Sequence, residues 1–183
     1  MGLGAVVAPA LHSLTDLMEV GGGGFSRAQL GANYAAFVMM PFVVLGLYAM
    51  QRPRIGWLGL LGALAYGMSF AYFAGTAVYA LARATPDYAT LLLELGDLYV
   101  AHGALMILGG ILFGTAVIRA RVLPPWTGAV LIAGVSLNLL VALSPMPPIV
   151  QTLGSAIRNL ALFGMGIALL GASPDPGEAA VGA

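Results

Sequence analysis

The chain has 183 residues, of which 60% are hydrophobic and 8% charged, whereas a soluble domain has about 25% charged residues. The mean hydropathy is +0.96, and seven arginines balance seven acidic residues, with no lysine. This composition excludes a water-soluble surface and the basic patch that nucleic-acid binding needs. The absence of cysteine and lysine excludes disulfides, thiolate metal sites and lysine imines. The sequence therefore predicts an all-α integral membrane protein.

Apolar stretches that can cross about 30 Å of hydrocarbon predict the helices in chain order. The first, Leu3–Val20, carries three ionisable side chains, so it is either a short polar span or an interfacial or re-entrant helix, and we favour a span. The other five are plainly apolar and cover Leu30–Met50, Ile55–Arg83, Leu98–Ile118, Trp126–Leu143 and Ile149–Leu170. We expect one bundle of about six transmembrane helices over residues 1–171 and a flexible tail over residues 172–183.

Four of the seven arginines lie in two tight turns, Gln51–Arg54 and Arg119–Pro125. The positive-inside rule places both turns in the cytoplasm and, with six spans, both termini there as well. The Gly21–Gly24 and Ala84–Asp97 loops then face the outside. The lipid bilayer is the expected partner, and a homo-oligomer is compatible with the sequence.

Glycines on the fourth span, Gly109, Gly110 and Gly114, predict close packing against a neighbouring helix. The stretch Phe113–Gly128, with one histidine in the first span and another in a later one, resembles short six-span hydrophobic proteins of high-GC bacteria. The resemblance covers most of residues 5–171, implies a bacterial cytoplasmic membrane and brings no function with it. Those proteins often have His-Pro in the first span, where this chain has His12-Ser13.

Polar side chains concentrate in the outward halves of the predicted helices, and the inward halves are almost purely aliphatic. Three helices each carry a polar stripe with the spacing i, i+4, i+7, which places its members on one face. The stripes are His12, Asp16 and Glu19; Tyr72, Thr76 and Tyr79; and Gln151, Ser155 and Arg158. Because lipid penalises such side chains, we expect the stripes to face one another around an outward-facing cavity that includes His102 and Asn138.

Arg158 lies about ten residues into its span, roughly 15 Å deep. An arginine at that depth costs about 2.5–3.5 kcal/mol on insertion scales. We therefore expect Arg158 to face protein and to pair with Asp16 as first choice or Glu19 as second. The alternative is an ion pair that only fixes the register of the helices.

This constellation predicts an intramembrane acid/base enzyme of cyclase or isomerase type, or a binder, acting on a lipophilic terpenoid, polyketide or lipid-like molecule. Burial favours the neutral form of a carboxylic acid, which the protonation of an alkene, epoxide or carbonyl requires. The candidate acids are Asp16 and Glu19, and the candidate bases are His102 and His12. The candidate substrate-binding residues are Tyr72, Thr76, Tyr79, Asn138, Gln151, Ser155 and Arg158.

Two functions from other classes stay open, a small transporter or channel and a non-catalytic membrane subunit. No cofactor or metal is expected. The alternative is bis-histidine haem ligation by His12 and His102, or a metal held by these histidines and acidic neighbours, but two histidines without a fixed spacing are a weak signal.

Overall fold

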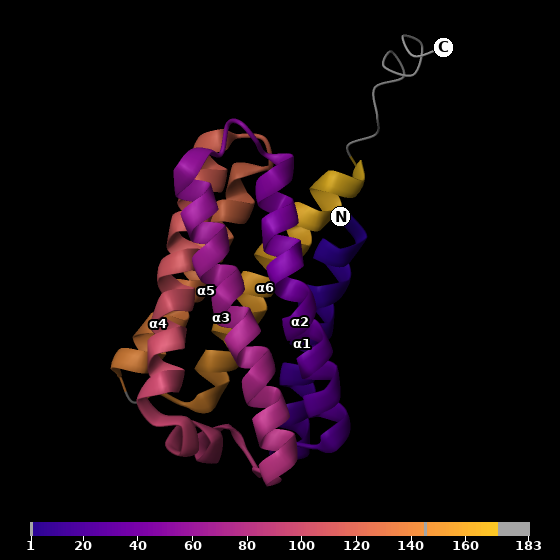
Figure 1. Cartoon of the computed structure of the whole chain (residues 1–183), viewed down its shortest axis with the longest axis vertical. Helices are drawn as coiled ribbons and strands as arrows, with labels where there is room; N and C mark the ends of the chain where they lie inside the picture. The colour runs from indigo at the N-terminus through magenta and orange to yellow at the C-terminus, as the bar shows by residue number, and fades with distance from the viewer. Residues whose placement is uncertain (1, 145, 172–183) are drawn as a thin grey trace.

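The computed structural model describes residues 2–144 and 146–171, which form six α-helices and no strand. The helices are α1 (Gly2–Gly22), α2 (Arg27–Met50), α3 (Gly56–Arg83), α4 (Tyr88–Ala120), α5 (Pro125–Leu143) and α6 (Pro148–Gly171). Successive helices run antiparallel along the long axis of the bundle (Figure 1). The predicted all-α bundle is confirmed, whereas the predicted tail over residues 172–183 lies outside the described residues.

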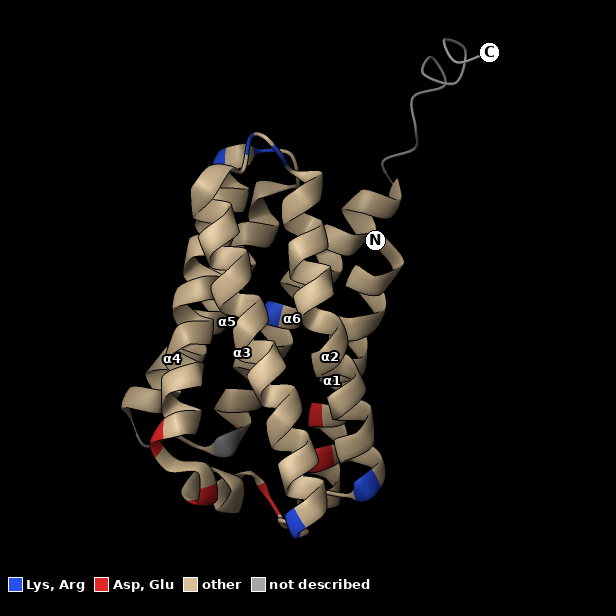
Figure 2. Cartoon of the chain, viewed as in Figure 1, with Lys and Arg blue, Asp and Glu red and all other residues tan. Residues whose placement is uncertain are grey.

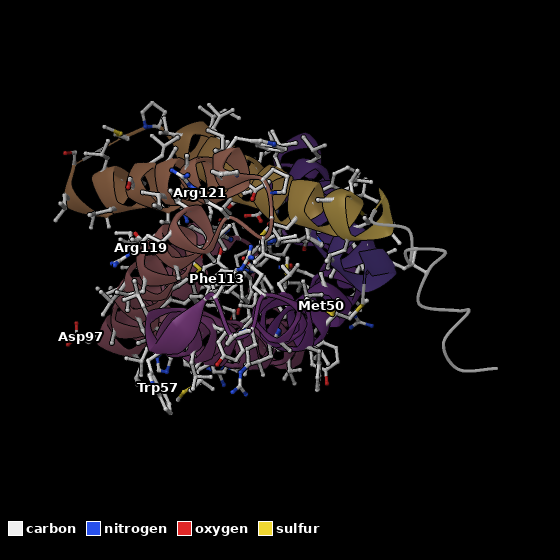
Figure 3. All side chains as sticks on the ribbon, turned by 90° about the horizontal axis from the view of Figure 1, so that it is seen from above. Met50, Trp57, Asp97, Phe113, Arg119 and Arg121 are labelled. Carbon is white, nitrogen blue, oxygen red and sulfur yellow. The ribbon has the colours of Figure 1, made fainter. Side chains whose placement is uncertain are left out.

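The helices form a ring, because each packs against its neighbours in the chain and α6 packs against α1. The view down the bundle shows Phe113 inside this ring and Trp57 and Asp97 on its outside (Figure 3). Tyr66, Phe70 and Phe113 are fully buried and fill the interior with aromatic side chains. The core therefore lies along the ring axis, and the outside of the ring is left for lipid.

Five helices, α2 to α6, are long and apolar enough to cross a membrane. The polar helix α1 is not among these five, but its 21 residues reach about 31 Å at 1.5 Å per residue. Large apolar side chains are exposed on the outside of the ring, among them Phe42, Leu61 and Met68. Length, composition and exposure together define a helical membrane bundle.

The predicted loop 84–97 is largely helical, which is the main correction to the predicted helix bounds. Asp87 caps α4 by accepting a hydrogen bond from the backbone N–H of Thr90 at 2.8 Å, and this bond holds the pKa of the Asp87 carboxyl below its usual range. The helix then breaks at Gly96, where φ is +51° and ψ is −132°. Glycine reaches this conformation without the steric cost that a Cβ brings. Hydropathy did not predict the first turns of α4, because this stretch contains acidic side chains such as that of Glu94.

Glycines allow α3 and α4 to pack with their backbones close together. A methyl group at Gly109 would lie 2.5 Å from the backbone nitrogen of Tyr66, and one at Gly62 would overlap the backbone nitrogen of Phe113. A methyl group at Gly114, facing α5, would lie 2.7 Å from the Gly128 carbonyl oxygen. The predicted use of Gly109 and Gly114 for helix packing is confirmed.

Candidate functional site

A polar network lies at the α1–α6 interface, where the ring closes. His12 is 2% exposed, and its Nδ1 lies 3.1 Å from Nδ2 and 3.3 Å from Oδ1 of Asn159. Asn159 Nδ2 also donates to Ser13 Oγ at 3.0 Å. Because the amide nitrogen is the nearer atom and can donate to both partners at once, we assign Nδ1 of His12 as an acceptor, which puts the imidazole proton on Nε2.

Asp16 lies one turn after His12 on the same face of α1, as the spacing predicts. Its Oδ1 is 3.6 Å from His12 Nε2, the nitrogen that carries the proton in this assignment. Its Oδ2 is buried and has no hydrogen-bond partner among the described residues. Seven other buried side-chain atoms of the described residues also lack a partner, so this oxygen is available to a ligand but does not by itself distinguish Asp16.

Arg158 is 5% exposed and points into the ring, which confirms that it faces protein and not lipid. In Figure 2, which colours lysine and arginine blue, the blue segment of α6 lies near mid-height of the bundle. The Nη1 atom of Arg158 is 3.3 Å from Met106 Sδ on α4, and the guanidinium carbon is 5.7 Å from the ring centroid of Phe70 on α3. The arginine therefore reaches across the ring towards α3 and α4.

The expected ion pair between Arg158 and a carboxylate of α1 is not formed. Within the described residues, the one contact of 4.0 Å or less between a basic side chain and a carboxylate joins His12 and Asp16. The Nε atom of Arg158 is buried without a hydrogen-bond partner. Because the arginine side chain is long and flexible, its place along α6 determines its depth but not the helix towards which its guanidinium extends.

His102 belongs to a second cluster, on α3 and α4. Its ring stacks on Tyr72 with a centroid distance of 3.7 Å and an interplanar angle of 8°. Its Nδ1 lies 2.8 Å from the carbonyl oxygen of Leu98, a distance at which an N–H at this nitrogen donates to its own helix. Both rings remain partly exposed on the outside of the bundle.

The two histidines do not share a site. His12 contacts Phe37, with ring centroids 4.8 Å apart, and Phe37 contacts Phe73 at 6.1 Å. Phe73 in turn contacts Tyr72, the stacking partner of His102, at 5.6 Å. Because these aromatic rings stand between the histidines, the structure does not gather His12, Asp16, Tyr72 and His102 around the single cavity that the sequence predicted.

The other candidate substrate-binding residues are dispersed as well. Thr76 donates to the Phe73 carbonyl of its own helix at 2.9 Å. Asn138 of α5 donates to Gln151 Oε1 of α6 at 2.9 Å and so joins these two helices. Ser155 is buried and Tyr79 is half-buried, and so is Glu19, the second candidate acid. Thr76 is thus bonded within α3 and Asn138 between α5 and α6, and neither is bonded to the His12 network.

A groove of about 280 Å³ lies beside the polar network, on the outside of the α1–α6 interface. Its lining consists of Pro9, Ala10, Ser13, Ala156, Asn159, Leu160 and Phe163. Two of these side chains are polar, Ser13 and Asn159, and both belong to the hydrogen-bonded network of His12. Asn159 and Ser13 were not among the predicted site residues, because neither has the i, i+4, i+7 spacing that singled out their neighbours.

Within the described residues, no three side chains of the types His, Cys, Asp or Glu gather in a way that could hold a metal ion. The fold and the network define a small polytopic membrane protein with a buried His–Asp pair behind a lateral groove. No protein-family model, curated protein or solved structure matches the chain.

Proposed function

We propose that the protein is an intramembrane acid/base enzyme, of cyclase or isomerase type, acting on a lipophilic molecule that enters the α1–α6 groove from the bilayer. One observation carries this proposal. The two polar side chains of the groove, Ser13 and Asn159, are hydrogen-bonded to buried His12, whose second ring nitrogen faces Asp16. An apolar ligand with one hydroxyl or carbonyl group matches a groove of this kind.

The proposed chemistry uses Asp16 twice. Asp16 does not itself line the groove, so the substrate has to reach past Ser13 and Asn159 to its unpartnered Oδ2. There neutral Asp16 donates a proton to the substrate, and as a carboxylate it then removes a proton from a neighbouring carbon, so an isomerisation needs no net proton. Between these steps the N–H of His12 Nε2 and the positive charge of Arg158 inside the ring stabilise the carboxylate. Ser13 and Asn159 hold the polar group of the substrate, and the apolar lining excludes water.

The interior of the ring favours this proposal over a transporter or channel. A transport path through one subunit needs polar side chains along the ring axis, but fully buried Tyr66, Phe70 and Phe113 occupy the interior. A non-catalytic membrane subunit needs no groove connected to a His–Asp pair, and it is an outcome that the following test distinguishes.

Replacing Asn159 with leucine tests the groove. The leucine has a similar volume but deletes the amide that connects the groove with His12, so we expect at least tenfold less co-purifying lipophilic ligand per protein. The measurement is mass spectrometry of the protein purified in mild detergent. Asn138→Leu is the matched control, because it removes a buried amide from the α5–α6 contact and should retain the wild-type amount.

Asp16→Asn separates binding from chemistry. This variant keeps the size and hydrogen bonding of the side chain but has no transferable proton, so it should retain the ligand while turnover of that ligand fails. Equal ligand content in the Asn159→Leu and Asn138→Leu variants, or a wild-type protein that carries no lipophilic molecule, would contradict the proposal and favour a structural subunit.

We also propose that the chain lies in a bacterial cytoplasmic membrane with its two Arg turns and both termini in the cytoplasm. In support, the start of α1 and the end of α6 lie towards the end of the bundle that carries these turns (Figures 1 and 2). The chain has no cysteine, so single cysteines report topology cleanly. In intact cells an impermeant maleimide should label the Gly22→Cys variant. It should label the Arg54→Cys variant only after the cells are permeabilised. The reverse pattern would mean that the protein has the opposite orientation.

A further inference from the structure

A second groove, of about 240 Å³, lies on the outside of the bundle between the start of α3 and the end of α4. Its apolar wall includes Ile55, Leu58 and Ala116, and two cationic side chains, Arg54 and Arg119, border it. Figure 3 shows Trp57, which also lines the groove, and Arg119 on the outside of the same flank of the ring. The groove therefore combines an apolar wall with two positive charges.

The positive charge of this groove is not neutralised within the described part of the chain. Neither Arg54 nor Arg119 has a carboxylate within 4.0 Å. The acidic residues of the described segments lie in the half of the bundle away from the Arg turns (Figure 2). The groove is thus complementary to an anion.

An exposed apolar stripe continues from the groove along α3. Trp57, Leu61, Leu64 and Met68 follow one another at spacings of four, three and four residues, which places them on one face. Their exposed fractions are 79%, 56%, 43% and 63%, so this face has no protein neighbour in the monomer. A tryptophan at the end of such a stripe is typical of the boundary between headgroups and hydrocarbon.

We propose that this groove is a binding site for one anionic phospholipid. Arg54 and Arg119 bind the phosphodiester of the headgroup, the indole of Trp57 packs beside the glycerol region, and an acyl chain follows Leu61, Leu64 and Met68. A zwitterionic lipid would add an ammonium group that meets two arginines and no carboxylate. Anionic lipids bind to basic pockets between helices in this way at the cytoplasmic side of membranes.

The test is native mass spectrometry of the intact protein in mild detergent, titrated with phosphatidylglycerol, with phosphatidylcholine or with inorganic phosphate. Replacing both arginines, Arg54→Gln with Arg119→Gln, should weaken phosphatidylglycerol binding roughly 25-fold, about fivefold for each basic side chain. The matched control is Arg52→Gln with Arg121→Gln. It also removes two positive charges from the end of the bundle that carries the Arg turns, but neither residue lines the groove. This control should bind within about twofold of wild type, and phosphatidylcholine should not distinguish the two double variants.

Three results would overturn the proposal. Equal weakening in both double variants would show attraction to the basic end in general, and equal wild-type affinity for both lipids would show an apolar groove without headgroup selection. Displacement of the lipid by millimolar inorganic phosphate would show a site for free phosphate. Where the double variant does not fold, Trp57→Ala is measured instead, and unchanged phosphatidylglycerol binding in that variant also contradicts the site.

Discussion

Replacing Gly62 with alanine should lower the free energy of unfolding by about 1–3 kcal/mol, the usual cost of overpacking. The added methyl group would overlap backbone atoms of Phe113 on α4, and backbone atoms cannot rotate away as the end of a side chain can. The two helices must therefore separate, and the contact between them loosens along its length. Thermal unfolding of the purified protein in detergent, followed by circular dichroism, measures the effect.

Gly75→Ala is the matched control on the same helix. A methyl group at Gly75 meets no atom within 4 Å, so the helix propensity of alanine should leave stability unchanged or raise it by about 0.5–1 kcal/mol. If Gly62→Ala unfolds at the same temperature as Gly75→Ala, the backbones of α3 and α4 are not in close contact at Gly62 and Phe113 in the membrane.

Replacing Arg158 with methionine should raise the stability of the fold, by about 1–4 kcal/mol. Removing one member of a buried ion pair is destabilising because it leaves the other charge uncompensated, whereas replacing a buried arginine that has no ionic partner leaves no such charge behind. Arg158 falls in the second case, because its guanidinium contacts Met106 Sδ and the face of Phe70 and has no carboxylate within 4.0 Å. The sign is opposite to that expected from a pair with Asp16.

The same thermal unfolding measurement checks this prediction, with Arg83→Met as the control. Arg83 is exposed at the last turn of α3, so its replacement should change stability by less than about 0.5 kcal/mol. A large loss of stability in Arg158→Met would show that the arginine and a carboxylate of α1 do pair in the membrane. If Arg158→Met is more stable but loses turnover of the groove ligand, the charge is retained for chemistry.

The fold could be predicted from the sequence because a bilayer leaves few alternatives. Hydropathy and length located α2, α3, α5 and α6 to within a few residues, since every apolar stretch of that length has to be a helix. The first turns of α4 were not predicted, because they contain acidic residues and hydropathy does not identify such a helix. The cap at Asp87 and the conformation of Gly96 determine its bounds instead. The glycines of α4 were interpreted correctly, because in lipid a close backbone approach is the commonest use of small residues.

The candidate site was predicted only where one helix determines it. The spacing of His12 and Asp16 placed them on one face, and the structure brings them within 3.6 Å. Which residues meet across helices depends on the rotation of each helix about its axis, and a single sequence does not specify that rotation. For this reason His102 lies with Tyr72 in a separate cluster, whereas Asn159, next to Arg158 in the chain, is the residue that reaches His12.

The closure of the ring has a consequence for the biogenesis of this protein. Helices α1 to α5 each find a packing partner as soon as the next segment is made, so they can assemble in the order of synthesis. The contact of α1 with α6 has to wait for the last helix, and that contact contains His12, Ser13 and Asn159. Until then the ionisable residues of α1 have no Asn159 beside them, and a nascent chain that ends before α6 presents His12 and Asp16 to lipid. The groove and its hydrogen-bonded network therefore exist only in a completely inserted protein, and a chain lacking α6 leaves His12 and Ser13 without the amide of Asn159.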